Sequence, residues 1–206
     1  MRKLFCLFAI VFMASCLYAK GSSPSEDIDV RHLYKLMQQD DWVHGTAEAK
    51  SLLNSIGESD STKAAVIRYV YLIASAGEVA IGKKTFDELE QEANQFIGKK
   101  LMTPGYELKV FDNDDSVRGN TLNVMLLQRN KPKEIFITQA NKKGTNILAF
   151  VKAMSSQLLG IDKLNSDPAL CTGVLTKVEI HRSSLRIWIM RLTLKDAHVY
   201  QISRSK

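Results

Sequence analysis

Apolar residues in the first half of the chain recur at the three- and four-residue spacing of α-helices. The stripes are formed by Val30, Leu33, Tyr34 and Met37, then Ala49, Leu52, Leu53 and Ile56, and later Phe86, Leu89, Ala93, Phe96 and Ile97. Between the second and third stripes, residues 64–81 are apolar on all sides except at Arg68 and Glu78. This pattern predicts a helix buried among the others.

Helix-end signals agree with these stripes. Ser23-Pro24-Ser25-Glu26 supplies a capping serine, a proline suited to a first helical position and an acid in the first turn. Thr85 and Glu88 have the spacing of a capping box, and Gly57 and Gly98 stand where helices would end. The sequence therefore predicts about four helices in residues 20–104.

The second half changes to the alternating, β-branched pattern of strands. Six segments carry it: 106–111, 121–127, 134–138, 172–181, 185–194 and 197–202. Turn-forming residues separate them at 112–115, 130–132 and 182–184. One helix is expected between Thr145 and Gly160, because Leu148, Val151, Ser155, Leu158 and Leu159 repeat at helical spacing.

These elements predict an α+β fold. An N-terminal helical bundle of about four helices would be followed, in residues 105–206, by a small five- or six-stranded antiparallel barrel or sheet with one helix. Residues 172–178 (TGVLTKV) and 194–199 (LKDAHV) resemble the last strands of small OB-fold barrels of exported proteins. That resemblance covers residues 98–202, and it implies a barrel face that binds oligonucleotides, oligosaccharides or proteins.

The first 19 residues have the pattern of a secretory signal peptide. Arg2 and Lys3 precede an apolar run over residues 4–17, and the small Ala19 follows it. The run is short for a membrane-spanning helix. Cleavage after Ala19 is favoured, and the sequence therefore predicts an exported protein that is periplasmic or secreted.

A second cleavage site is the alternative. Met13-Ala14-Ser15-Cys16 resembles a bacterial lipobox, in which Cys16 would be lipidated and would anchor the protein to a membrane. With either cut, Cys6 is lost and Cys171 is the one thiol of the mature chain that lipid does not occupy. An internal disulfide framework is therefore excluded, and we expect Cys171 to be a small buried residue.

Composition is that of an ordinary folded protein, but charge is divided unevenly along the chain. The chain has 45% hydrophobic residues, 24% charged residues and a net charge of +6, which argues against disorder and against a multi-span membrane protein. Residues 20–115 carry 11 basic and 17 acidic residues, whereas residues 116–206 carry 15 and 5. A basic half of this kind binds an anionic partner or docks on its own acidic half, and both interpretations remain open.

Metal-binding and catalytic motifs are not matched. His32, His44, His181 and His198 do not stand at ligand spacing, and the acidic run at Asp112, Asp114 and Asp115 has Val117 where a calcium loop of the EF-hand type needs glycine. The sequence has no nucleophile elbow, Ser-x-x-Lys motif or phosphate-binding glycine loop. We expect no metal and no cofactor, and a catalytic site only if the fold assembles one around Cys171, His181 or residues 112–115.

Basic residues of the second half are the main functional signal. Candidate binding residues are Arg129, Lys131, Lys142, Lys143 and Arg186, together with Trp188, because arginine beside an aromatic ring binds phosphates, sugars or stacked bases. The competing interpretation places Trp188 in the core with arginines along its rim.

The sequence thus predicts a non-enzymatic binding or assembly module of the bacterial cell envelope. Its basic β-rich half would engage a protein or an anionic envelope component, and export argues against nucleic acid as the routine ligand. The alternative is an exported hydrolase whose site only the fold assembles.

Overall fold

The computed structural model describes residues 28–57, 61–111, 121–125, 134–141, 147–154, 169–182 and 188–201. Four helices come first along the chain: α1 (Ile28–Gln38), α2 (Trp42–Ile56), α3 (Thr62–Ala80) and α4 (Phe86–Asn94). Seven strands follow: β1 (Lys100–Met102), β2 (Glu107–Phe111), β3 (Thr121–Met125), β4 (Glu134–Ala140), β5 (Ile147–Met154), β6 (Ala169–Ile180) and β7 (Trp188–Gln201). The α+β class and the order of helices before strands are confirmed.

Local sequence signals explain where the helices begin. The Asp41 side chain accepts a hydrogen bond from the His44 backbone N–H at the start of α2, and Ser61 does the same for Ala64 at the start of α3. The predicted capping box is present at α4, with Thr85 and Glu88 bonded reciprocally. The proposed cap at residues 23–26 lies outside the described residues.

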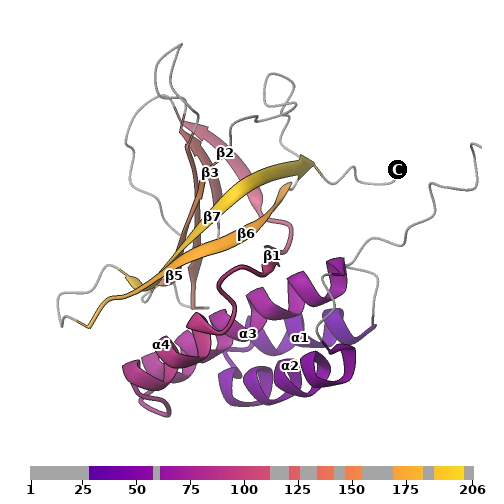
Figure 1. Cartoon of the computed structure of the whole chain (residues 1–206), viewed down its shortest axis with the longest axis vertical. Helices are drawn as coiled ribbons and strands as arrows, with labels where there is room; N and C mark the ends of the chain where they lie inside the picture. Colours follow the sequence, from indigo (N-terminus) through magenta and orange to yellow (C-terminus); the bar gives the residue numbers. More distant parts are fainter. Residues whose placement is uncertain are drawn as a thin grey trace, which may run out of the picture.

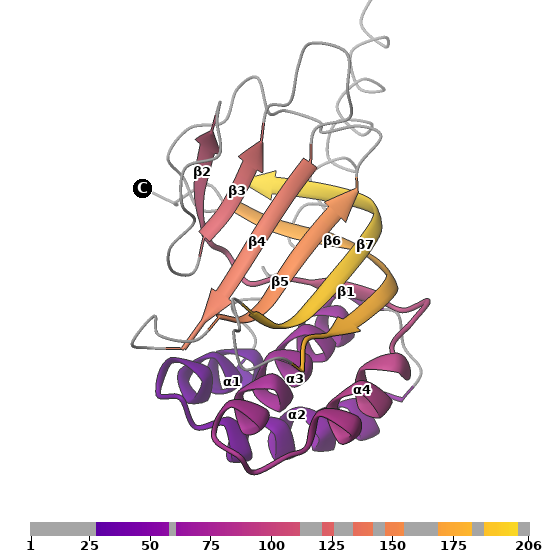
Figure 2. The same ribbon diagram turned by 90° about the vertical axis from the view of Figure 1, so that its left-hand side faces the viewer.

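The helices form a layer beside the sheet, with α3 against β1, β5 and β7 (Figures 1 and 2). Apolar residues of both layers belong to one hydrophobic core. A buried polar chain crosses the junction: the hydroxyls of Tyr69 and Tyr106 lie 3.3 Å apart, and Tyr106 donates to the side-chain oxygen of Gln139. The helical and β-rich regions therefore stabilise each other through shared packing. Within the described residues, none of the helices has the length and hydrophobicity needed to cross a membrane.

The sheet is mixed rather than antiparallel. Its order is β1-β6-β7-β5-β4-β3-β2, with parallel pairs at β5/β7 and β2/β3 and antiparallel pairs elsewhere. The three-residue strand β1, which sequence periodicity did not predict, extends the sheet beyond β6. The expectation that all strands pair antiparallel is therefore wrong, because β2/β3 and β5/β7 are parallel.

The predicted helix between Thr145 and Gly160 is also wrong where the structure describes it. Residues Ile147–Met154 form β5, which pairs with β4 and β7. Leu148 and Val151 fit helical spacing, but so does any continuous apolar run of this length, and buried central strands have the same composition. Pairing with neighbours on both sides decides the conformation here.

The long hairpin of β6 and β7 replaces three predicted segments. The described parts of the segments 185–194 and 197–202 belong to one strand, β7, which passes through Asp196, where φ is 50°. Thr172 pairs with His198 and Val174 with Lys195, so two residues of β7 lie opposite Gly173. This β-bulge bends the strand while the ladder continues on both sides.

The OB-type barrel is not confirmed. Tyr106, just before β2, exchanges backbone hydrogen bonds with Ala169 at the start of β6. This isolated bridge links the β2 end of the sheet to β6, the strand beside β1, at one point, but the described residues show no ladder that closes a barrel there.

Candidate functional site

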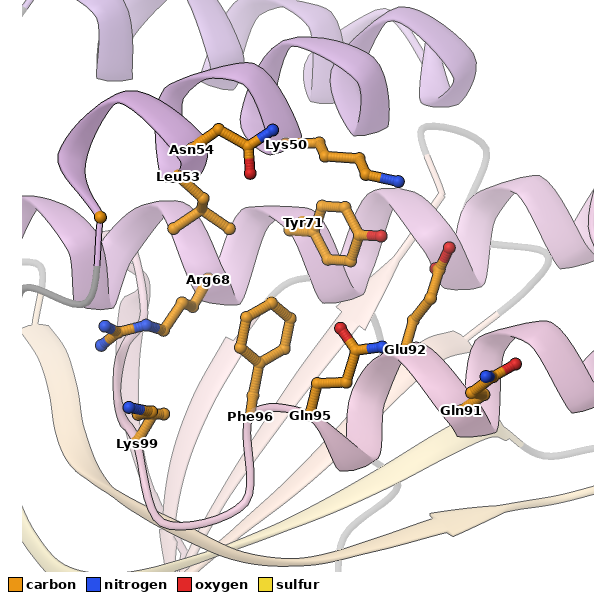
Figure 3. A pocket seen from close by; sticks show the side chains of 11 residues that line it. Lys50, Leu53, Asn54, Arg68, Tyr71, Gln91, Glu92, Gln95, Phe96 and Lys99 are labelled. Atoms are coloured by element: carbon orange, nitrogen blue, oxygen red, sulfur yellow. The ribbon is translucent and has the colours of Figure 1, made fainter.

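A polar pocket of about 600 Å³ opens in the helical layer, away from the predicted β-rich site. Helices α2, α3 and α4 and the turn between α4 and β1 supply its walls (Figure 3). The lining residues are Lys50, Leu53, Asn54, Gly57, Arg68, Tyr71, Gln91, Glu92, Gln95, Phe96 and Lys99. The volume is in the range of pockets that hold small ligands.

Arg68 and Lys99 form a cationic end of the pocket (Figure 3). Arg68 belongs to the buried face of α3, is 3% exposed and donates a hydrogen bond of 3.2 Å to the carbonyl oxygen of Lys100. Lys99 lies in the turn that Gly98 permits with φ of 86°. Backbone hydrogen bonds from Gly98 to Leu175 and from Leu175 to Lys99, 2.8 and 3.0 Å long, fix this turn on β6.

An aromatic pair forms the wall between the two ends. The rings of Tyr71 and Phe96 meet edge to face, with centroids 5.6 Å apart and planes at 78°. Burial raises the pKa of the Tyr71 hydroxyl well above its usual value, and the neighbouring charge of Glu92 and a hydrogen bond to it raise it further. Tyr71 is therefore a neutral hydrogen-bonding group at neutral pH.

Lys84 fixes Glu92, the carboxylate at the other end of the pocket. Its ammonium group donates to Glu92 Oε2 at 2.5 Å and to Ser75 Oγ at 2.9 Å, and it lies 2.9 Å from Glu78 Oε2 in an ion pair without hydrogen-bond geometry. Ser75 in turn donates to Glu92 Oε2 at 3.0 Å. These contacts fix the Glu92 carboxylate in position and compensate its negative charge.

The serine and lysine of this cluster do not form a catalytic pair. Lys84 donates to the oxygen of Ser75, whereas a base that activates a serine must accept its proton. The Ser75 side chain is also completely buried. None of the eleven described residues that line the pocket is a serine, threonine, cysteine or histidine.

Of the six binding residues predicted from the sequence, Trp188 alone lies within the described residues. Arg129, Lys131, Lys142, Lys143 and Arg186 lie outside the described residues, as does Cys16. Trp188 is half-buried at the start of β7. Its ring centroid lies 5.0 Å from that of His181 and 4.6 Å from the guanidinium carbon of Arg191. Side chains of this protein therefore already contact the aromatic ring that was expected to receive a ligand.

Acidic residues of α4 neutralise one of the basic residues of the hairpin. The guanidinium group of Arg182 lies 2.5 Å from Asp87 Oδ1 and 2.5 Å from Glu90 Oε2. Hydrogen bonds to Glu90 and Asp87 raise the pKa of Arg182 above its usual value. At this point the basic half docks on the acidic helices, as one of the two interpretations of the charge asymmetry expected.

Cys171 lies near the start of β6 and His181 follows the end of the same strand, so these two catalytic candidates are not brought together. Cys171 is completely buried in the core, and residues 112–115 lie outside the described residues. His32 bonds Glu48 at 2.8 Å and His44 bonds Asp41 at 2.8 Å, but no three metal-ligating side chains gather within the described part of the chain.

We expect Cys171 to be unreactive in the folded protein. Burial raises the pKa of its thiol from 9.0 to about 12, so the thiolate that attacks disulfide reagents is not formed near neutral pH. Labelling with a thiol-specific disulfide reagent should be complete only after denaturation. Rapid labelling of the native protein at the same rate as the unfolded chain would contradict this burial.

The same shift predicts a loss of stability in alkali. The folded protein keeps the thiol proton that the unfolded chain releases above about pH 9, so the stabilisation is full below that pH and falls as the pH rises toward about 12. Denaturant unfolding at about pH 8 and about pH 10.5 measures it. Cys171→Ala should lose less stability between these values than the parent protein, and an equal loss would exclude Cys171 as a contributor.

One feature of the sequence marks the pocket, although the sequence alone did not predict a pocket there. Arg68 and Glu78 are the two charges within an otherwise apolar segment, and the structure places Arg68 in the pocket and Glu78 on Lys84. Lys50, Gln95 and Lys99 come from separate elements, and their convergence has no sequence motif.

Comparison of this chain with models of known protein families, with curated proteins and with solved structures finds no match. The geometry of the pocket therefore carries the functional argument.

Proposed function

We propose that this protein is an exported, non-enzymatic binding module of the bacterial cell envelope that holds an anionic envelope component in the helical pocket. The observation that carries the proposal is the convergence of Lys50, Arg68 and Lys99 on one polar pocket, in which Glu92 is the one carboxylate among the lining residues that the structure describes. Cations around a concave surface concentrate an anionic ligand and orient it.

Two features support binding rather than turnover. Glu92 already contacts Lys84, so its charge opposes an anionic ligand less than an uncompensated carboxylate would. The lining residues that the structure describes offer cations and amide groups, and none of them is a serine, threonine or cysteine nucleophile. The export part of the proposal rests on the signal-like residues 1–19, with lipid anchoring at Cys16 as the alternative.

The pocket is a better candidate than the basic β-rich surface at the residues that the structure describes. Arg182 is paired with α4, and His181 and Arg191 contact the ring of Trp188. A hydrolase is the weaker alternative, because Cys171 and Ser75 are both completely buried.

Charge reversal should locate the site. Purified bacterial cell-wall material, an anionic glycan and peptide polymer, is sedimented with the protein at low and high salt. We expect Lys50→Glu and Lys99→Glu each to reduce the sedimented fraction at low salt, because each replaces a pocket cation with a repelling charge. High salt should reduce binding of the parent protein.

The matched control is Lys195→Glu, which makes the same charge change at an exposed position of β7. It should sediment like the parent protein. A double variant, Arg186→Glu with Lys142→Glu, tests the β-rich surface. Loss of binding in this double variant with full binding in both pocket variants would move the site to the β-rich half.

A further inference from the structure

The two ends of the pocket differ in chemistry, and this difference identifies a ligand class. We propose that the pocket binds an acidic saccharide, with the sugar carboxylate at Arg68 and Lys99 and the hydroxyl groups toward the amide-lined end. This inference rests on the proposed function, because it names the ligand of the same site.

The cationic end fits a carboxylate. Arg68 is held on α3 and by its bond to Lys100, so its planar donor groups are preorganised, and Lys99 adds a second positive charge from the fixed turn. Guanidinium groups recognise carboxylates with paired, charge-assisted hydrogen bonds. Ordering of these groups before binding reduces the entropy that the ligand must overcome.

The remaining lining fits the body of a sugar. Asn54, Gln91 and Gln95 each offer a donor and an acceptor, as paired sugar hydroxyls require. Leu53 and Phe96 supply apolar surface beside them, which can pack against the C–H groups of a sugar ring. A ligand of this kind needs polar and apolar partners side by side, and this lining provides both.

Glu92 argues against a ligand with charge along its whole length. It lies toward the end of the pocket opposite Arg68 and Lys99 (Figure 3), and Lys84 and Ser75 fix its Oε2 atom. A carboxylate there would repel a second anionic group but would accept hydrogen bonds from hydroxyls. The geometry thus favours one acidic group at one end over a polyphosphate or a nucleic acid.

A bare ion would fill only a small part of the pocket. A volume of about 600 Å³ exceeds what one carboxylate or phosphate ion fills, so most of the polar lining would contact water alone. An oligosaccharide with one or a few rings would use the amide and aromatic walls as well as the cations.

Calorimetric titration of the purified full-length protein tests the inference with four probes: an acidic trimer that carries one terminal glucuronic acid on two neutral xylose rings, a neutral xylose trimer, acetate and inorganic phosphate. We expect the acidic trimer to bind at least about tenfold more tightly than each other probe, because it alone uses both ends of the pocket. Equal binding of the neutral trimer, or tighter binding of phosphate or acetate, would overturn the saccharide assignment.

Two variants, at Lys99 and at Gln95, separate the contribution of the cationic end of the pocket from that of the amide-lined end. Lys99→Gln should weaken the acidic trimer about tenfold and leave the neutral trimer unchanged, whereas Gln95→Ala should weaken both trimers. Lys195→Gln, at an exposed position of β7, is the matched control and should bind like the parent. Unchanged binding in both pocket variants would place the sugar elsewhere.

The outcomes distinguish this inference from the proposed function. Pocket-dependent sedimentation with cell-wall material, without binding of the acidic trimer, overturns the saccharide assignment alone. Binding of a peptide with a free C-terminal carboxylate in preference to the trimer also overturns that assignment and leaves the proposed function standing. Absence of both sedimentation and trimer binding overturns the two proposals together.

Discussion

Lys84→Met is expected to lower the free energy of unfolding by about 3 kcal/mol, because removing one partner of a buried ion pair leaves the other charge uncompensated. Lys84 is 11% exposed, as is Glu78, and its ammonium group is shared with Glu92. Methionine has a similar length but offers no donor to the two carboxylates. Denaturant unfolding monitored by circular dichroism measures the change.

Two companion variants make this result specific. Lys83→Met removes the neighbouring charge at an exposed position and should change stability by less than about 0.5 kcal/mol. Adding Glu78→Gln to Lys84→Met should recover part of the loss, since one of the unpaired charges is then removed. Equal effects of Lys83→Met and Lys84→Met would show that the cluster does not stabilise the helices.

Gly77→Ala is expected to destabilise the protein by about 2 kcal/mol, although alanine favours helices over glycine. A Cβ atom at position 77 would lie 2.2 Å from Cδ2 of Trp42, so the indole ring of α2 packs directly on the backbone of α3. Trp42 is 3% exposed, and it can make room only by disturbing the core. Thermal or denaturant unfolding should show the loss.

Gly45→Ala is the matched control, because Gly45 also lies in a buried helix face. Its Cβ would meet Ala74 Cβ at 3.5 Å and Leu36 Cβ at 4.0 Å, which are ordinary contacts. We expect a gain of about 0.5–1 kcal/mol from the better helix former. A gain in both variants would mean that Trp42 does not pack on Gly77 as described.

The helices could be predicted from the sequence because their signals are local. Capping residues such as Thr85 and the apolar periodicity of each stripe depend on neighbours within a few positions. One inward residue was misassigned: Ile97 is 46% exposed, since α4 ends at Asn94 and the stripe stops with it. Local signals thus gave the elements but not all of their limits.

The sheet depended on pairing between distant residues. Nothing in residues 147–154 distinguishes a short buried helix from a central strand until β4 and β7 are in place on either side. The parallel pairing of β5 with β7 and the short strand β1 are likewise properties of the assembled fold. The mixed order of the sheet was therefore beyond sequence reasoning.

The sequence did not predict the helical pocket, for a related reason. The clustering of basic residues along the second half drew attention to Trp188, whereas the pocket collects single residues from α2, α3, α4 and a turn. Buried Arg68 was its one sequence signal, because a charge inside an apolar helix needs a partner or a ligand. A site whose residues are far apart in the sequence has no local motif, so it becomes visible only in the folded structure.

Acidic-ligand binding in the helical pocket is tested most directly by an amide NMR titration of the purified protein with the acidic trimer that carries one terminal glucuronic acid. The pocket predicts that the largest shifts occur in α2, α3 and α4 and at residues 95–99, which surround Arg68 and Lys99. Shifts confined to β7 around Trp188, with the helical residues unmoved, would contradict it.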